Sequence, residues 1–142
     1  MSADENKAFI RHWVEQGWNQ GDLGLVETYF AADYQLHDPA MPPLPPGPQG
    51  FRGFMAALRA AFPDLHYAIE DMVAEGDRVV WRATLTGTHR GEFNGIPATN
   101  RTVRVSGMIL SRLAAGQFAE DWSVVDMLGL LQQLGVIPAP GA

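Results

Sequence analysis

The stretch Tyr67–Thr88, YAIEDMVAEGDRVVWRATLTGT, decides the fold, because its pattern predicts two strands and the turn that joins them. Glu75-Gly76-Asp77 is the turn signal, and apolar and β-branched residues flank it on both sides. A second turn signal, at residues 114–116, separates two later strand-like runs. Turns of this kind between neighbouring strands predict antiparallel hairpins. The expected strands are Tyr67–Val73, Arg78–Thr88, Arg101–Leu113 and Phe118–Val125.

Apolar residues at helical spacing precede and follow these strands. Pro63 stops the third of the helices that precede the strands. After the last strand, Asp126 suits the N-cap of a closing helix, and Gly135 suits its C-terminal stop. The expected helices are 4–18, 25–30, 51–62 and 127–134.

This order of elements predicts an α+β fold, in which a curved antiparallel sheet wraps around the N-terminal helices to form a cone with a hydrophobic pocket. Gly87 and Gly107 lie inside strand patterns, where glycine permits the bend that such a sheet needs. Residues 38–50 contain six prolines and cannot form a helix or a central strand. A loop of this length in a small domain favours a functional role, such as the rim of a cavity.

The composition limits the classes of function. A chain of 142 residues with 46% hydrophobic content predicts one domain, and no apolar run approaches the ~20 residues that span a bilayer. The polar, acidic first residues are not a signal peptide, and the absence of cysteine fits a reducing compartment, so we expect a cytoplasmic protein. The net charge of -6 argues against nucleic-acid or anionic-membrane partners.

The same composition narrows the chemistry. Lys7 is the only lysine and lies among solvent-type residues, so a Schiff-base mechanism is not expected. No two histidines have the spacing of a helical or strand ligand pair, so no metal site is predicted. Carboxylates, four histidines, hydroxyls and aromatic rings remain for a site without a cofactor.

Six short motifs, spread in order along the chain, are similar to those of the SnoaL-like polyketide cyclase (ester cyclase) family. They are Trp18-Asn19, His37-Asp38-Pro39, residues 61–65, residues 75–79, residues 87–99 and residues 133–135. The resemblance places residues 1–142 in a single SnoaL-like domain of the nuclear-transport-factor-type cone superfamily. It implies a deep hydrophobic pocket, cofactor-free acid/base chemistry, and a homodimer or higher homo-oligomer, commonly built on the outer sheet face.

In the family's aldol cyclases, an aspartate on the last strand removes a proton alpha to a carbonyl, and a histidine and a glutamine on the preceding strand assist. Counted along this sequence, the aspartate position falls on Ser123, the histidine position on Ile109 and the glutamine position on Gly107. The three groups are missing, so the resemblance does not extend to the aldol reaction.

Asp121 is the alternative candidate for a catalytic acid or base. It lies two residues before Ser123, hence on the same strand face and about 7 Å away. In an apolar pocket its pKa would rise toward neutrality. The other interpretation is an exposed aspartate that is solvated or paired with an arginine such as Arg112. Glu120 faces the opposite way and is expected to pair with an arginine in solvent.

Two histidines are further catalytic candidates. His37 precedes the proline loop and could shuttle a proton at the cavity rim, or could be held in a turn by backbone carbonyls or Asp38. His89 shares a strand face with Trp81, and could act in the pocket or fix the neighbouring hairpin loop by hydrogen bonds. The expected substrate-binding residues are Trp18, Phe54, Phe62, Ile109 and Ser123.

Three functions remain open. The first is acid/base chemistry on a small hydrophobic carbonyl or ester compound of polyketide type: isomerisation, cyclisation or hydration. The second is epoxide hydrolysis or epoxide-opening cyclisation, which would need Asp121 in contact with a second acid or an arginine. The third is a non-catalytic module that binds a hydrophobic ligand, since a pocket without positioned acid/base groups can still bind.

Overall fold

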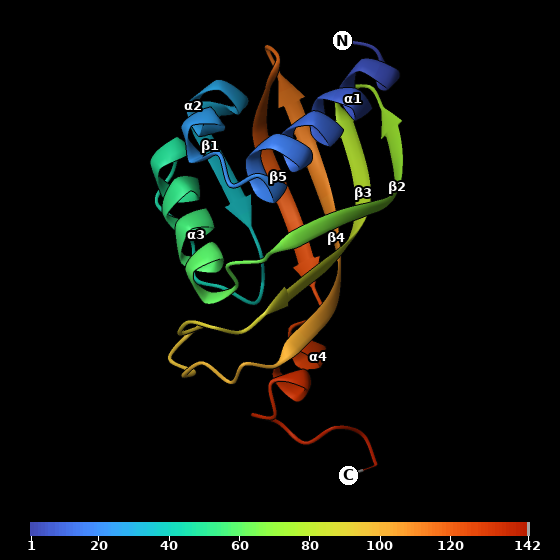
Figure 1. Cartoon of the computed structure of the whole chain (residues 1–142). Helices are drawn as coiled ribbons and strands as arrows, with labels where there is room; N and C mark the ends of the chain where they lie inside the picture. The colour runs from blue at the N-terminus through green and yellow to red at the C-terminus, as the bar shows by residue number, and fades with distance from the viewer. Residues whose placement is uncertain (142) are drawn as a thin grey trace.

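Five strands form one curved sheet in the computed structural model, which describes residues 1–141, and their order across the sheet is β1-β5-β4-β3-β2 (Figure 1). The strands are β1 Phe30–His37, β2 His66–Glu75, β3 Arg78–Thr88, β4 Thr102–Ala114 and β5 Gln117–Val125. The pairs β2–β3 and β4–β5 are antiparallel, as the turn signals predict, and the pair β3–β4, joined by a longer connection, is antiparallel too. The α+β fold with a curved sheet around N-terminal helices is therefore confirmed.

The edge strand β1 differs from the prediction. The sequence pattern predicts a short extended piece only for residues 34–37, but the strand begins at Phe30, which was expected to end a helix. It pairs with β5 in parallel, with Leu36 opposite Asp121, so the sheet is mixed at this edge. The parallel pairing places the end of β1, and the start of the proline loop, beside the inward face of β5.

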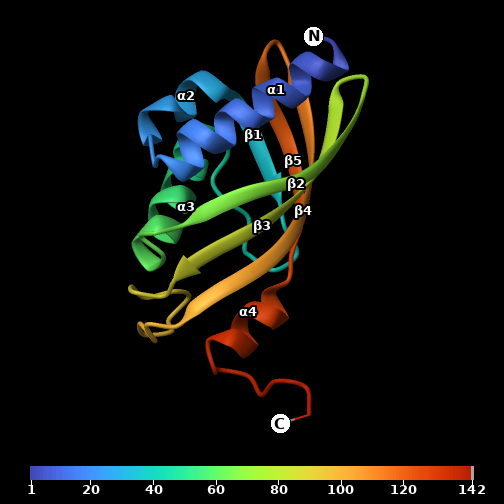
Figure 2. The same cartoon turned by 45° about the vertical axis from the view of Figure 1, so that its right-hand side comes forward.

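The N-terminal helices cover the concave face of the sheet, and a short closing helix lies at the end of the sheet that follows β5 (Figures 1 and 2). The helices are α1 Ala3–Trp13, the π-helix η1 Val14–Asn19, the 3-10 helix η2 Leu23–Leu25, α2 Val26–Tyr29, α3 Pro48–Ala61 and α4 Met127–Gln133. A reciprocal capping box starts α1: the Ser2 hydroxyl accepts from the Glu5 N–H at 3.1 Å, and the Glu5 carboxylate accepts from the Ser2 N–H at 3.3 Å. Asp126 caps α4 as predicted, accepting from the Gly129 N–H at 2.9 Å.

Residues 38–47, which we call the proline loop, lie between β1 and α3. Gly47 adopts a φ of 88°, and its N–H donates to the Tyr34 carbonyl at 2.8 Å. Pro48 then begins α3, where its fixed φ suits the first turn, so the expectation that residues 38–50 form no helix is wrong for residues 48–50. A Cβ on Gly50 would lie 1.8 Å from the Pro45 carbonyl oxygen, so α3 touches the loop through a position that only glycine can occupy.

Aromatic side chains fill the space between helices and sheet. The rings of Trp13, Phe30 and Phe51 lie within about 6 Å of one another, and Trp13 and Phe30 are 1% exposed. Gly87 and Gly107 serve close approaches in this interior: a Cβ on either would lie 3.2 Å from Phe62 or Val125, respectively. This packing closes one end of the cone and leaves the other end hollow.

Candidate functional site

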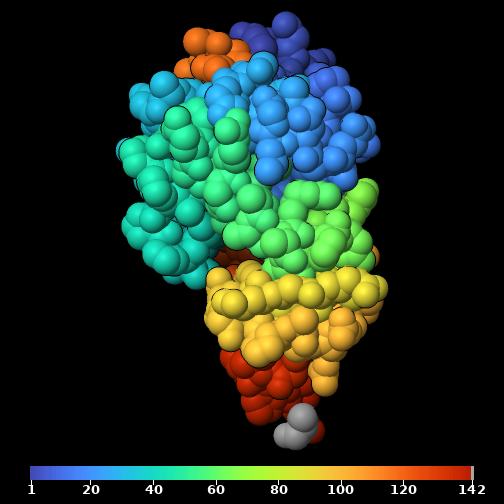
Figure 3. All heavy atoms as spheres, turned by 60° about the vertical axis from the view of Figure 1, so that its left-hand side comes forward, coloured from blue at the N-terminus to red at the C-terminus, as the bar shows by residue number. Residues whose placement is uncertain are grey.

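Two connected cavities lie inside the hollow end of the cone. The inner chamber has a volume of about 80 Å³, and its walls are mainly aromatic, including Trp13, Trp18, Phe30, Phe51, Trp81 and Phe118. The outer vestibule has a volume of about 500 Å³ and is walled by the proline loop, α3 and residues near α4. Figure 3 shows the hollow between the teal-green proline loop and α3 on one side and the yellow β3–β4 connection on the other.

Five residues line both cavities and form what we call the neck: Asp38, Phe54, Tyr67, Leu85 and Val125. A ligand that fills both cavities must pass this ring. The combined space lies in the range of small-molecule sites. The hydrophobic pocket expected from the sequence is therefore present.

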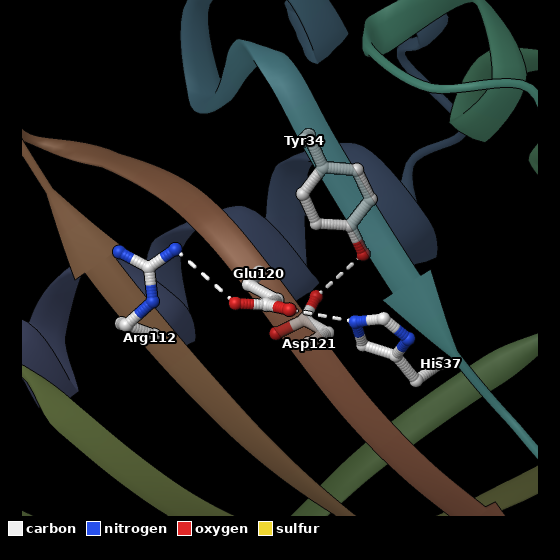
Figure 4. Close-up of polar contacts among 5 residues, drawn as sticks. All are labelled: Tyr34, His37, Arg112, Glu120 and Asp121. Atoms are coloured by element: carbon white, nitrogen blue, oxygen red, sulfur yellow. Dashed lines mark hydrogen bonds and ion pairs between the residues drawn. The ribbon is translucent and has the colours of Figure 1, made fainter.

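Asp121 lines the inner chamber from β5 and is 6% exposed. The Tyr34 hydroxyl on β1 donates to Asp121 Oδ2 at 2.7 Å (Figure 4). Asp121 Oδ1 is buried and has no hydrogen-bond partner among residues 1–141. Burial raises the pKa of Asp121 to about 6, although the hydroxyls of Ser111 and Tyr34 oppose the rise. The carboxyl group is thus poised near neutrality: Oδ2 accepts from Tyr34, and Oδ1 makes no hydrogen bond within residues 1–141, although the Ser111 hydroxyl lies near enough to lower the pKa of the group.

The neighbours of Asp121 fix its surroundings. Ser111 is its register partner on β4 and is itself fully buried. The Ser111 hydroxyl accepts from Trp81 Nε1 at 3.0 Å, so the indole orients the hydroxyl beside the carboxyl group. The interpretation in which Asp121 is exposed or paired with Arg112 does not hold, because Arg112 instead donates to Glu120 at 3.2 Å.

Asp38 is a second carboxylate of the cavity, which the sequence interpretation had not included among the site residues. Its Oδ2 accepts from the Ser123 hydroxyl at 2.6 Å, and its Oδ1 accepts from the Ala40 N–H at 2.8 Å. Burial, and then the negative charge of Asp38, raise the pKa of the Tyr67 phenol. The motif His37-Asp38-Pro39 indicated that this residue could matter. The sequence did not predict the parallel β1–β5 pairing that brings Asp38 to Ser123.

The positions counted from the family pattern all reach the chamber. Gly107, Ile109 and Ser123 line it, and Ile109 is the register partner of Ser123. Asp121 lies one inward-facing pair deeper, opposite Ser111. The acid therefore lies further inside the cone than the position where the aldol cyclases carry theirs.

The aromatic candidates for substrate binding divide into two groups. Trp18 and Phe54 line the chamber, and their rings are 6.1 Å apart. Phe62 does not reach it, which corrects the prediction: it is 2% exposed and packs against His89 and Phe93 at the end of α3. The helical stripe did not distinguish core from cavity, because both need large apolar side chains.

His37 does not lie at the cavity where it was expected. It faces the outer side of the sheet, where its Nε2 lies 2.6 Å from Glu120 Oε2 (Figure 4). Its ring also stacks on Trp122. Alternation along β1 explains the difference, since Tyr34 and Leu36 take the inward positions. The hydrogen bond from His37, and then the one from Arg112, lower the pKa of Glu120.

His89 is fully buried but lines neither the chamber nor the vestibule. Its Nδ1 accepts from the Thr99 N–H at 3.2 Å, and its backbone exchanges hydrogen bonds with Asn100 and Arg101. This is the alternative role stated for it, fixing the loop between β3 and β4. The structure gives no support for a place in the pocket.

The described residues contain neither a candidate metal site nor a membrane-spanning helix. In residues 1–141, no three histidine or acidic side chains are grouped so that they could hold a metal ion. Across the same range, no helix has the length and apolar character to cross a membrane.

Comparisons with solved structures show the same fold over nearly the whole chain. TsrD from Streptomyces laurentii is 28% identical with a TM-score of 0.86, and the match covers 96% of this chain and 99% of TsrD. AclR from Streptomyces galilaeus, a proposed hydroxylase, is 31% identical with a TM-score of 0.85 over 97% of this chain and 85% of AclR. IdmH from Streptomyces antibioticus, a proposed polyketide cyclase, is 33% identical with a TM-score of 0.79 over 92% of this chain and 99% of IdmH.

No curated protein is significantly similar to the chain in sequence. The family model for SnoaL-like polyketide cyclases, however, matches residues 8–134. That range contains every strand, the neck and Asp121, so the match includes the site as well as the scaffold. The resemblance expected from the motifs is confirmed, and the chain belongs to the SnoaL-like polyketide cyclase family.

Proposed function

We propose that this protein is a cofactor-independent cyclase or isomerase that acts on a small hydrophobic carbonyl or ester compound of polyketide type, with Asp121 as the proton-transfer group. One observation carries the proposal: Asp121 Oδ1 is buried, unpartnered among residues 1–141, and faces an apolar chamber. A carboxylate is costly to bury unless it is paired or used. Its pKa of about 6 suits a general base near neutral pH.

The proposed step is a proton transfer in which nothing is consumed. Oδ1 accepts a proton from the carbon alpha to the carbonyl, the C–H bond breaks, and its electron pair moves to the carbonyl oxygen as an enolate. Tyr34 keeps its hydrogen bond to Oδ2, so Oδ1 is the oxygen left for the proton. The protonated Asp121 then returns a proton to the rearranged product, which restores the carboxylate.

The chamber also restricts which carbon can react. Its lining residues, all within the described part of the chain, include no lysine, arginine or histidine that would stabilise an enolate by charge. The negative charge must therefore be spread within the substrate itself. A carbon flanked by two carbonyls, or by a carbonyl and an aromatic ring, meets this requirement.

The other two functions receive less support. Epoxide opening would need Asp121 in contact with a second acid or an arginine, whereas its hydrogen-bond partner is the Tyr34 hydroxyl. A pure binding module would gain nothing from an unpartnered buried carboxylate, which disfavours an apolar ligand. The binding module becomes the better account if the experiment below shows no chemistry.

The test is hydrogen–deuterium exchange of 2-tetralone in D₂O, followed by NMR, since its C1 protons flank both a carbonyl and a ring. We expect the wild type to accelerate exchange above the buffer rate, and Asp121→Asn to lose about 10²-fold or more of that acceleration. Asp33→Asn is the matched control, because Asp33 is an exposed aspartate on β1. Equal exchange with wild type and Asp121→Asn contradicts the proposal and favours the binding module.

A further inference from the structure

We infer that the neck selects ligands that present a hydrogen-bond donor, such as a hydroxyl group, and excludes anions, with Asp38 as the residue that determines this selectivity. The inference rests on the proposed function only in placing the ligand in the Asp121 cavity. It concerns which substrates enter and how they are oriented, not how they react. Asp38 is thus a specificity-determining residue rather than a catalytic one.

Asp38 is positioned for this role by two elements far apart in the sequence. It follows β1 directly and lines both the chamber and the vestibule. The Ala40 N–H holds Oδ1 and the Ser123 hydroxyl holds Oδ2, so the carboxylate has a fixed orientation. Two carboxylate oxygens offer about four lone-pair sites, and these two contacts use two of them. The Asp38 carboxylate can therefore still accept a hydrogen bond from a ligand.

Three polar residues that line the chamber, Asp38, Asp121 and Ser123, present hydrogen-bond acceptors. The Ser123 hydroxyl gives its hydrogen to Asp38, which leaves only lone pairs for a ligand. Deeper in the chamber, Asp121 Oδ1 is more than nine-tenths buried and unpartnered among residues 1–141. Tyr67 adds a phenol, which stays protonated beside Asp38 because burial and that charge raise its pKa.

The charged side chains that line the two cavities also favour a neutral ligand over an anion. Neither the chamber nor the vestibule is lined by lysine, arginine or histidine within the described residues, while both are lined by Asp38. An anionic ligand would lose its hydration without gaining a cation, and would face two carboxylates. A neutral ligand with an O–H group would instead donate to Asp38.

The distance between Ser123 and Asp121 along β5 indicates how such a ligand would lie in the cavity. Ser123, which contacts Asp38, and Asp121 are two residues apart on β5, or about 7 Å. A substrate would place its reacting carbon at Asp121 in the chamber and its hydroxyl at the neck. Its remaining apolar part would occupy the vestibule, among Met41, Leu44 and Phe93.

Three probes of one shape test the selectivity: 2-naphthalenemethanol, 2-naphthoate and 2-methylnaphthalene, which differ only in the group that reaches the neck. Their dissociation constants are measured by isothermal titration calorimetry at pH 8. We expect the alcohol to bind at least 10-fold more tightly than the carboxylate, and several-fold more tightly than the methyl compound, because hydrogen bonds to charged acceptors are strong.

Asp38→Asn at the neck and Ser123→Ala at its hydrogen-bond partner in the chamber should differ in their effect on this preference. Asp38→Asn removes the charge and introduces an N–H donor, so the preference for alcohol over carboxylate should fall at least 10-fold. Ser123→Ala frees Oδ2 of Asp38 from its internal donor, so the preference should stay or increase. Asp33→Asn, which removes an exposed charge on β1, should leave the preference unchanged.

The inference is overturned if the carboxylate binds wild type within threefold of the alcohol, if none of the probes binds, or if Asp38→Asn keeps the wild-type preference. The thermal melting of each variant shows whether it is folded. If Asp38→Asn is not folded, the preference of Ser123→Ala for the alcohol over the carboxylate tests the inference independently. The Asp121→Asn variant separates this inference from the proposed function. It should lose exchange of 2-tetralone and still prefer the alcohol.

Discussion

Asp121 carries its carboxyl group in a chamber of aromatic and aliphatic side chains, held by a phenol on one oxygen and free on the other. The folded protein therefore binds the Asp121 proton more tightly than the unfolded chain does. Raising the pKa from 3.8 to about 6 corresponds to about 3 kcal/mol of lost stability above both values. Stability contributed by this group is present below pH 3.8 and is lost as the pH rises through 6.

Replacing this residue should accordingly stabilise the protein at alkaline pH. Asp121→Asn stays neutral and keeps an oxygen for the Tyr34 hydroxyl, so its free energy of unfolding at pH 8 should exceed that of wild type by up to about 3 kcal/mol. The gain should shrink toward pH 4, where the wild-type carboxyl is protonated. Urea unfolding at both pH values measures it, and a destabilised variant at pH 8 would disprove the raised pKa.

Tyr34 sets how far the pKa of Asp121 rises. Its hydrogen bond favours the ionised carboxylate and so lowers that pKa against the effect of burial. In Tyr34→Phe the pKa should rise further, and less of the base is ionised at a given pH. We expect the pH–rate profile of 2-tetralone exchange to shift to higher pH, with a larger loss of rate at pH 6 than at pH 8. An unshifted midpoint would show that the phenol does not act on the base.

The sequence predicts the place of Asp121 in the cavity better than that of Asp38. Asp121 follows from alternation along one strand, because the faces of β5 can be counted from Ser123. Asp38 depends on the approach of β1 to β5, between residues 85 positions apart in sequence. Strand patterns do not specify which edge strand pairs with which partner, so this contact could not be predicted.

Among the helices and strands, the features predicted correctly are those that depend on residues close together in the sequence. The hairpin turns, the stop at Pro63 and the cap at Asp126 all depend on neighbouring residues and are confirmed. The π-helix η1 was missed, because helical periodicity does not reveal where one extra residue enters a turn. There Gly17 lies under the Trp13 ring, where a Cβ would be 2.2 Å from it.

Helix α3 contains a matched pair of glycines that tests its contact with the proline loop. A Cβ on Gly50 would collide with the Pro45 carbonyl, whereas a Cβ on Gly53 would meet nothing within 4 Å. Gly50→Ala should destabilise the protein by about 2 kcal/mol or more, and Gly53→Ala should stabilise it by about 0.5–1 kcal/mol through helix propensity. Denaturant unfolding of both variants gives the answer, and similar values for the two would show that loop and helix do not touch.

For the whole molecule, a row of apolar side chains crosses the outer face of the sheet. Val73, Val80, Leu110 and Trp122 follow one another in register across four strands. Beside them, Met108 and Val124 are register partners and are 52% and 64% exposed. Exposed apolar patches of this kind mark interaction surfaces. We propose that a second copy of the chain covers this face in a homodimer.

Analytical ultracentrifugation tests that assembly. The wild type should sediment as a dimer, and Met108→Glu should weaken self-association at least 10-fold by burying a charge in the interface. Ala56→Glu adds the same charge at an exposed position of α3, and should leave the dimer intact. A monomeric wild type, or equal association of both variants, would rule out this face.

In the cone, β1, β5 and the adjoining Asp38 provide the acidic and hydroxyl groups, helices and strands together supply the aromatic walls, and the proline loop forms one wall of the vestibule. The central claim is that this enclosure keeps the Asp121 carboxyl group poised near neutrality. A ¹³C NMR titration of the aspartate carboxyl carbons tests it, with the Asp121 signal identified by its loss in Asp121→Asn. The account predicts a midpoint of about 6, whereas a midpoint near the ordinary aspartate value of 3.8 would contradict it.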